Sequence, residues 1–343
     1  MMKNIYYILL MSVLIFGCQK QTSPQMSNTS GSYIFFETEI AGTKANLIED
    51  NLPNISYTSF NVFGYRSDNV TPIFNMYKEG ANSSFDNVAV LYRNDIKSDF
   101  SCDEMALWHN GEHTFYGYYY GASHNPRNPN YSKDIITGIN KLPARPFIEY
   151  KQPETLDGMI DLMTATKTAN ASGGPVILTF DHRLFALDII VKNSQSATPL
   201  KIIAASVEFY NILSSATIYF DGGMTGNTYG NLEHTYNIAE GTEIKNTDPL
   251  NLNDIHDKGS DSFLLLPCPS LKATIILTIV DSWNEVQELT IDRSANGEDI
   301  TPEGGFLAGH KYELTINKTD KGIEFGYNIV PWDDEVSVGM EFN

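Results

Sequence analysis

Residues 273–280 read ATIILTIV, a short apolar stretch rich in β-branched side chains. This composition favours a buried strand over a helix, because β-branched side chains fit a pleated sheet and the run is short. Elsewhere, apolar residues alternate with their neighbours, as in strands that bury one face. They are Leu187, Ile189 and Val191; Ala205, Val207 and Phe209; and Leu314 and Ile316. The pattern predicts an all-β chain.

Turn signals rich in glycine separate these runs, at residues 221–223, 296–297 and 303–305. The best helical candidate, residues 155–165 (TLDGMIDLMTA), is short and contains Gly158. Many short strands joined by such turns are typical of β-sandwiches.

The chain has 343 residues. At roughly 100–200 residues per domain, this length predicts two domains. The small-residue stretch 166–175 (TKTANASGGP) is either a linker or a surface loop, and it lies near the middle of the chain. We therefore expect one β-sandwich over residues 33–175 and a second over residues 176–343.

Composition excludes several classes of protein. The chain carries 23 Lys and Arg against 42 Asp and Glu, a net charge of −19. Such a balance argues against a nucleic-acid binder and against a polybasic membrane-surface module, which both need a basic face. The apolar share of 42% is enough for a folded core. Three cysteines are too few for a disulfide scaffold or a cysteine-rich zinc protein.

The first residues have the pattern of a secretory signal peptide. Lys3 precedes an apolar run over residues 5–16, and the motif Ile15-Phe16-Gly17-Cys18 resembles a bacterial lipobox, although Phe16 is bulkier than usual. We expect cleavage after residue 17, acylation of Cys18 (by palmitate, for example) and a polar tether over residues 18–32. The alternative is an ordinary signal peptide that happens to contain a cysteine.

Several further segments follow in a characteristic order. They are residues 34–45 (IFFETEIAGTKA), 60–65 (FNVFGY), 114–120 (TFYGYYY), 161–165 (DLMTA), 178–184 (LTFDHRL) and 306–314 (FLAGHKYEL), and a late Trp332. Together with the lipobox and the tether, this ordered set resembles the fimbrillin family, the two-domain lipoprotein pilins of Gram-negative anaerobes.

The resemblance implies two tandem transthyretin-like antiparallel β-sandwiches. We expect no enzyme, no cofactor and no metal, because the sequence contains no G-x-S-x-G elbow, Walker loop or dinucleotide fingerprint. The resemblance implies assembly with other fimbrial subunits into an adhesive fimbria, on the outer membrane surface, with an unknown host or bacterial ligand. It also implies that a trypsin-like protease removes the N-terminal strand after a basic residue. A strand from a neighbouring subunit then fills the groove.

The residues of this chain fit the displaced strand. Ile34, Phe36, Thr38 and Ile40 would share one face, so that removing the strand would expose apolar pockets. The candidate processing residue is Lys44, where the family often carries Arg; Arg66 is the next basic residue. Lys44 could equally be an ordinary turn lysine. An uncut chain would be a cell-proximal anchor or a surface lipoprotein that never polymerises.

The C-terminal segment, residues 336–343 (VSVGMEFN), also alternates. Its apolar residues Val336, Val338, Met340 and Phe342 would face one way in a strand, which makes the tail a candidate donor strand. The alternative is that the tail is the last strand of its own domain.

Other functional hypotheses rest on less. Residues 109–113 (HNGEH) match the zinc motif H-x-x-E-H, but Asn110-Gly111 is a strong turn signal and the zinc chemistry needs both histidines on one helix. Tyr116, Tyr118, Tyr119 and Tyr120 could form a glycan-stacking platform or could simply pack in a core. A surface lipoprotein that binds glycan or another ligand is therefore the alternative function. Cys102 and Cys268 are expected to be small buried side chains.

Overall fold

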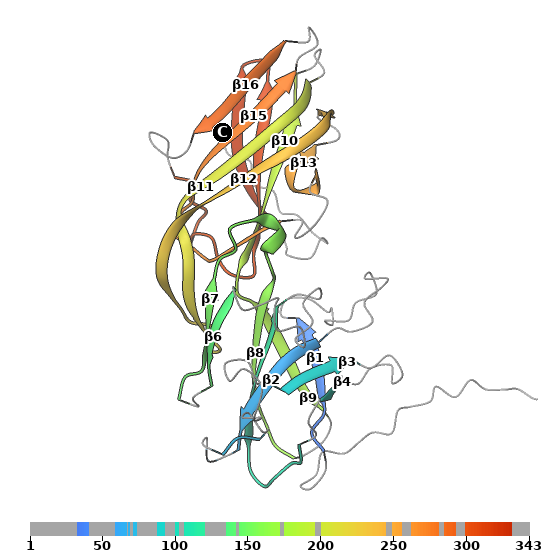
Figure 1. Ribbon diagram of the computed structural model, residues 1–343, viewed down its shortest axis with the longest axis vertical. Helices are drawn as coiled ribbons and strands as arrows, with labels where there is room; N and C mark the ends of the chain where they lie inside the picture. Colours follow the sequence, from blue (N-terminus) through green and yellow to red (C-terminus); the bar gives the residue numbers. More distant parts are fainter. Residues whose placement is uncertain are drawn as a thin grey trace, which may run out of the picture.

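The computed structural model describes residues 33–40, 59–66, 68, 71–73, 88–92, 100–102, 106–120, 135–141, 144–171, 175–195, 200–244, 249–255, 262–280, 285–292 and 299–330. These residues form strands and two short 3-10 turns, with no α-helix among them. The strands make three sheets, so the predicted all-β fold is confirmed. Figure 1 shows the first sheet at one end of an elongated molecule and the other two sheets packed toward the opposite end.

The first sheet closes on itself in the order β1-β4-β3-β2-β5-β8-β9. Its strands are β1 (Phe36–Ile40), β2 (Ser59–Tyr65), β3 (Val88–Tyr92), β4 (Phe100–Cys102), β5 (His113–Tyr120), β8 (Leu162–Ala169) and β9 (Val176–His182). β1 runs parallel to β9, whereas the other neighbours in this sheet are antiparallel.

The second and third sheets form the sandwich. The second sheet contains β13 (Leu250–Asn251), β10 (Phe185–Asn193), β17 (Lys311–Thr319), β18 (Gly322–Val330) and β14 (Phe263–Leu265). The third contains β16 (Val286–Asp292), β15 (Lys272–Val280), β11 (Leu200–Tyr219), β12 (Met224–Ile244), β7 (Phe147–Lys151) and β6 (Ile136–Asn140). β10 and β17 are parallel, so two parallel pairs interrupt the antiparallel sheets that were expected.

The stretch 273–280 explains the sandwich core. It lies within β15, where Ala273, Ile275, Leu277 and Ile279 are buried and the residues between them are half-buried. Apolar side chains of β10, β11 and β17 pack into the same core. β15 pairs with β11 along its length and with β16 from Thr274 to Val280, so most of its backbone groups are paired on both sides.

The best helical candidate, residues 155–165, does not form an α-helix. Only the single 3-10 turn η1 (Leu156–Gly158) forms, and the second short turn, η2 (Leu252–Ile255), lies elsewhere. The remainder of the stretch enters β8, because Leu162–Ala169 pairs with β5 residue by residue. Tertiary pairing here overrides a weak local helical pattern.

The three sheets do not divide the chain at residue 175. β9 follows that position and pairs with β1 and β8 in the first sheet, whereas β6 and β7 precede it and belong to the third. The chain therefore enters the third sheet, returns to the first, and enters the sandwich again. The division into domains over residues 33–175 and 176–343 stays a prediction.

A long hairpin of the third sheet reaches the first sheet. β11 and β12 pair from Leu200↔Ile244 to Ile218↔Met224. The hairpin bends toward the first sheet, and β6 and β7 accompany its far half (Figure 1). The register breaks between Phe209 and Ile212, where Asn211 has a φ of 53° and its amide donates to Asn231 Oδ1 at 3.1 Å. Two further register shifts follow between Leu213 and Ala216, and irregularities of this kind bend a strand pair.

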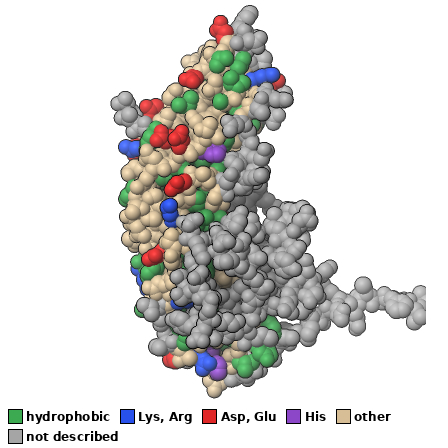
Figure 2. Space-filling view, in the orientation of Figure 1, with side chains coloured by type: hydrophobic (Ala, Val, Ile, Leu, Met, Phe, Trp, Pro, Cys, Tyr) green, Lys and Arg blue, Asp and Glu red, His purple; other side chains and the backbone are tan. Residues whose placement is uncertain are grey.

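No helix in the described ranges is long and apolar enough to cross a membrane. On the face drawn in Figure 2, Asp and Glu side chains are scattered along the molecule and the coloured basic side chains do not gather into a patch. The described side chains on this face match the acidic composition and form no basic patch of the kind that binds nucleic acid.

Candidate functional site

The site most relevant to the predicted strand exchange is the place that β1 occupies. β1 pairs with β9 along its full length, from Phe36↔Val176 to Ile40↔Phe180. Its pairing with β4 is limited to Phe36↔Phe100. β1 is thus bordered on both sides, but continuously on only one of them.

The residues just before β1 are also held. The Ile34 amide donates to Ala106 O at 2.9 Å, and Tyr33 bridges to Leu107. On the other side, the Val176 amide donates to Phe35 O at 2.8 Å. Residues 33–40 therefore form one extended segment that inserts between the 106–107 segment and β9.

The side chains of this segment alternate as expected. Ile34 and Phe36 are 4% and 1% exposed, whereas Phe35 is half-buried and Glu37 is exposed. Ile34 and Phe36 share one core with other buried side chains on the inner side of the first sheet. We call this set of surrounding side chains the β1 seat. The seat contains Phe60, Trp108, Phe115, Val176, Leu178 and Phe180.

Aromatic rings give the seat its shape. The Phe36 ring meets Phe115 and Phe60 edge to face, with centroids 5.4 and 6.2 Å away. Phe60 in turn meets Phe180 at 5.4 Å. Gly117 leaves room for this cluster, because a Cβ there would lie 3.0 Å from Phe180 Cζ.

The seat favours an apolar strand energetically. Burial of a side chain such as Ile34 or Phe36 contributes roughly 1.5–3 kcal/mol. Each edge-to-face pair adds about 0.5–1.5 kcal/mol. Without β1 the seat would be an open apolar groove lined with unpaired β9 backbone groups, and an extended strand would satisfy both needs.

Part of the predicted site cannot be placed. Thr38 and Ile40 lie in β1, but only their backbone is described. Cys18, Lys44, Val336, Val338, Met340 and Phe342 lie outside the described residues. They stay sequence-based predictions.

Arg66 is the weaker candidate for processing. It directly follows β2, and its amide donates to Thr71 O at 2.9 Å. A cut after Arg66 would detach β2, which pairs with both β3 and β5. A cut after Lys44 would detach β1 alone, whose described pairing with β4 is limited to one residue pair, whereas a cut after Arg66 would also remove β2.

The histidines of residues 109–113 do not have the helical geometry of a zinc motif. His109 is exposed before a turn, and His113 is fully buried as the first residue of β5. The His113 Nδ1 lies 3.0 Å from Gly111 O, and its ring meets Trp108 edge to face at 5.1 Å. Burial lowers the pKa of His113. In the part of the chain that the structure describes, no group of three His, Cys, Asp or Glu is placed to hold a metal.

The tyrosines of β5 do not present an exposed platform. Tyr118 and Tyr119 are 2% and 8% exposed, and they pack into different cores. The half-buried Tyr116 stacks on Phe63 at 5.1 Å. The side chain of Tyr120 is not described. The three described rings therefore serve packing.

Cys268 is a half-buried free thiol whose pKa is raised to about 12 by burial. A thiol of this kind is a poor nucleophile at neutral pH. Of Cys102, in β4, only the backbone is described.

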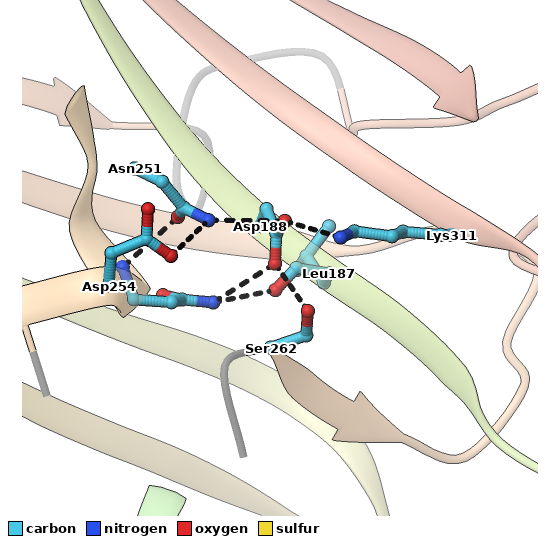
Figure 3. A network of polar contacts seen from close by, with 7 residues as sticks. Leu187, Asp188, Asn251, Asp254, Ser262 and Lys311 are labelled. Carbon is cyan, nitrogen blue, oxygen red and sulfur yellow. Dashed lines mark hydrogen bonds and ion pairs between the residues drawn. The ribbon is translucent and has the colours of Figure 1, made fainter. Parts of the chain in front are cut away.

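A buried polar network in the second sheet was missed from the sequence. Asp188 is 2% exposed, and Lys311 Nζ lies 3.1 Å from its Oδ2. Ser262 Oγ donates to Asp188 Oδ1 at 2.5 Å, and Asn251 Nδ2 donates to Oδ2 at 3.2 Å (Figure 3). Asn253 Nδ2 donates to Leu187 O at 3.0 Å. The alternating apolar neighbours of Asp188 placed it on a solvent-facing side, but η2 and the start of β14 cover that side.

The network joins five elements. Asp188 is on β10, Asn251 on β13, Asn253 on η2 and Lys311 on β17. The Tyr236 hydroxyl of β12 donates to Asn253 Oδ1 at 2.6 Å, and burial raises the pKa of Tyr236. The carboxylate accepts bonds at both oxygens, so the network anchors the sandwich edge.

The family model described as fimbrillin-like matches residues 58–332, which is most of the chain. The chain belongs to the fimbrillin-like family. β1 precedes the matched range of this fimbrillin-like chain.

Solved structures share its fold. A fimbrial protein from Bacteroides vulgatus is similar with a TM-score of 0.55 at 15% identity, over 88% of this chain and 99% of that one. A proposed cell adhesion protein from Bacteroides uniformis has a TM-score of 0.51 at 18% identity, over 88% and 99%. At such identities the likeness establishes the fold alone. No curated protein matches the chain.

Proposed function

We propose that this fimbrillin-like chain is a subunit or anchor of an adhesive fimbria on the surface of a Gram-negative bacterium, and that it assembles by strand exchange at the β1 seat. Membership of the family supports the fimbrial role. The observation that carries the exchange is the position of β1. It is the first described strand, and its segment places Ile34 and Phe36 in an apolar seat. Among the described residues it pairs along its full length with β9 and at one residue pair with β4.

The exchange would proceed by substitution of one strand for another. A cut after Lys44 would separate residues 1–44 from the rest of the chain, so that β1 would be held only by non-covalent contacts. An incoming strand that reproduces the β9 hydrogen bonds and fills the pockets of Ile34 and Phe36 would recover most of the lost burial energy. The C-terminal residues Val336, Val338, Met340 and Phe342 of a neighbouring subunit have the alternation that this seat requires.

Membrane attachment would precede the exchange. The signal peptide over residues 1–17 would be removed, Cys18 would carry the acyl chains, and residues 18–32 would join the lipid to the first sheet. Processing at Lys44 would release the chain from this anchor. A chain left uncut would remain next to the membrane as the anchor.

The proposal is tested with the mature chain and limited trypsin treatment. We expect cutting after Lys44 to produce a ladder of polymers on a denaturing gel run without boiling, and monomer after boiling. A Lys44→Ala chain should yield no ladder, and a chain that lacks residues 336–343 should be cut but not polymerise. Monomer alone from the wild-type chain after complete cutting at Lys44 would contradict the proposal.

A further inference from the structure

The tip of the β11–β12 hairpin has a rigid turn. The Tyr219 amide donates to Gly223 O at 2.8 Å, and the Gly222 amide donates to Tyr219 O at 3.0 Å. Gly222 has a φ of 93°, which a residue with a side chain rarely adopts. Arg145 pairs with Asp221 at 2.8 Å and its guanidinium lies over the Tyr219 ring. These contacts fix the direction of the residue between them, Phe220.

Phe220 inserts into the outer face of the first sheet. It is 2% exposed, and its ring meets Phe63 edge to face at 5.3 Å. It also lies 5.6 Å from the Tyr116 ring and 6.4 Å from the Tyr118 ring. The backbone of Phe220 is tied as well, because Thr166 Oγ1 on β8 donates to its carbonyl oxygen at 3.0 Å.

Two of the strands that form the β1 seat, β2 and β5, also receive Phe220. In β2, Phe60 packs in the inner core with Phe36, and Phe63 packs in the outer core with Phe220. In β5, Phe115 faces inward and Tyr116 and Tyr118 face outward. Only the thickness of one sheet separates the Phe220 contact from the Phe36 contact, since successive residues of a strand point to opposite faces.

This arrangement matters when β1 leaves. The inner face would then lose Ile34 and Phe36 and hold an apolar gap, and the residues around such a gap relax into it to an extent that depends on their support. A closed sheet can fill the gap by moving β2 and β5 inward. A ring anchored on the outer face opposes that movement, because β2 and β5 could move inward only by leaving a second gap around Phe220.

We infer that Phe220 is a positioning residue for strand exchange: it braces β2 and β5 from the sandwich side and keeps the β1 seat in a shape that an incoming strand can enter. The inference rests on the proposed function of the seat. The long hairpin thereby acquires a role beyond the sandwich, since its bend and fixed tip deliver one aromatic side chain to the outside of the other sheet.

The brace is tested first on the intact chain, without cutting or polymerisation. Hydrogen exchange is measured at the amides of β1 and β9 in Phe220→Ala and Phe220→Leu. The matched controls are Phe209→Ala and Phe209→Leu, because Phe209 is also a buried ring of this hairpin but meets Phe263 in the sandwich at 5.1 Å. We expect exchange in β1 and β9 to rise about tenfold or more in Phe220→Ala and less in Phe220→Leu, with little rise in either control.

Equal exchange in the Phe220 variants and wild type would overturn the brace, and so would an equal rise in the Phe209 controls. The Leu variants keep the comparison available if an Ala variant fails to fold. A second measurement uses the chain cut after Lys44 and a fluorescent peptide of residues 33–44. The brace predicts that Phe220→Leu slows entry of the peptide severalfold relative to Phe209→Leu.

The two measurements separate the inference from the proposed function. If the cut wild-type chain never takes up the peptide, strand exchange is contradicted, and the hydrogen exchange of the intact chain still decides whether Phe220 supports the seat. If the peptide enters all four Leu and Ala variants at the wild-type rate, the brace is overturned while strand exchange stands.

Discussion

The rings of Phe36 and Phe115 meet edge to face, with centroids 5.4 Å apart and planes at 85°. This contact joins the first described strand to a central strand of the first sheet. β1 and β5 are not hydrogen-bonded neighbours in the sheet, so side-chain packing joins them at this point. The proposed assembly requires that contacts of this kind hold β1 in place and that a strand from a neighbouring subunit can form similar contacts.

The first prediction concerns Phe36 itself. Phe36→Ala should lower the free energy of unfolding of the first sheet by about 3 kcal/mol, since a fully buried ring is removed from an aromatic cluster. Phe35→Ala, at the neighbouring half-buried position, should cost clearly less. Urea denaturation followed by tryptophan fluorescence measures both, with Trp108 in the β1 seat as a reporter. Equal losses in the two variants would mean that the inner face of β1 has no special role.

The second prediction concerns the buried network of Asp188. Asp188→Ala should lower the free energy of unfolding of the sandwich by about 3 kcal/mol, because Lys311 and the surrounding donors lose their common acceptor. The control is Arg145→Ala, which removes an exposed ion pair with Asp221 and should change stability little. Similar denaturation midpoints for Asp188→Ala and wild type would show that the network is dispensable.

The third prediction concerns pH. Burial lowers the pKa of His113 below its ordinary value of 6.5, so the folded chain binds this proton less readily than the unfolded chain. The contribution of His113 to stability is therefore present above pH 6.5 and is lost as the pH falls through the folded pKa. His113→Phe should show a smaller loss of stability between pH 7 and pH 5 than wild type, as measured by urea midpoints.

His310→Phe is the control for this comparison, because His310 is exposed, whereas the charge of His109 contributes to the lowered pKa of His113. It should retain the acid sensitivity of wild type. Identical pH profiles for wild type and His113→Phe would contradict the assignment of the acid sensitivity to His113.

The fourth prediction concerns Cys268. Its raised pKa of about 12 keeps the thiol protonated in the folded chain, so alkylation by iodoacetamide at pH 8 should be slow and should accelerate when urea unfolds the protein. The same shift makes the folded state less favourable as the pH rises from the unfolded pKa toward 12. Peptide mapping at Cys268 measures the modification, and rapid modification of the folded chain would disprove the burial of its sulfur.

Local patterns predicted much of this fold because burial follows alternation. The runs around Ile189, Val207, Ile275 and Leu314 became sandwich strands, since each places apolar side chains on one face. The parallel pairing of β1 with β9 joins residues far apart in the chain, and no local pattern encodes it. The buried position of Asp188 depends on η2 and β14, which cover it from later in the chain.

The candidate site divides in the same way. The alternation of Ile34 and Phe36 predicted which side chains of the first strand are buried. The role of Phe220 could not be read from its neighbours, because a Phe beside Asp221-Gly222-Gly223 looks like the end of an ordinary hairpin. Only the bend of that hairpin brings the ring to Phe63.

The central claim is that β1 is expendable and that a neighbour's strand replaces it. The most direct measurement is the N-terminal sequence of the protein in boiling-sensitive polymers recovered from its native cell surface. The account predicts a chain that begins at Ala45, with β1 absent. Polymers whose subunits begin at Cys18 and retain β1 would contradict it.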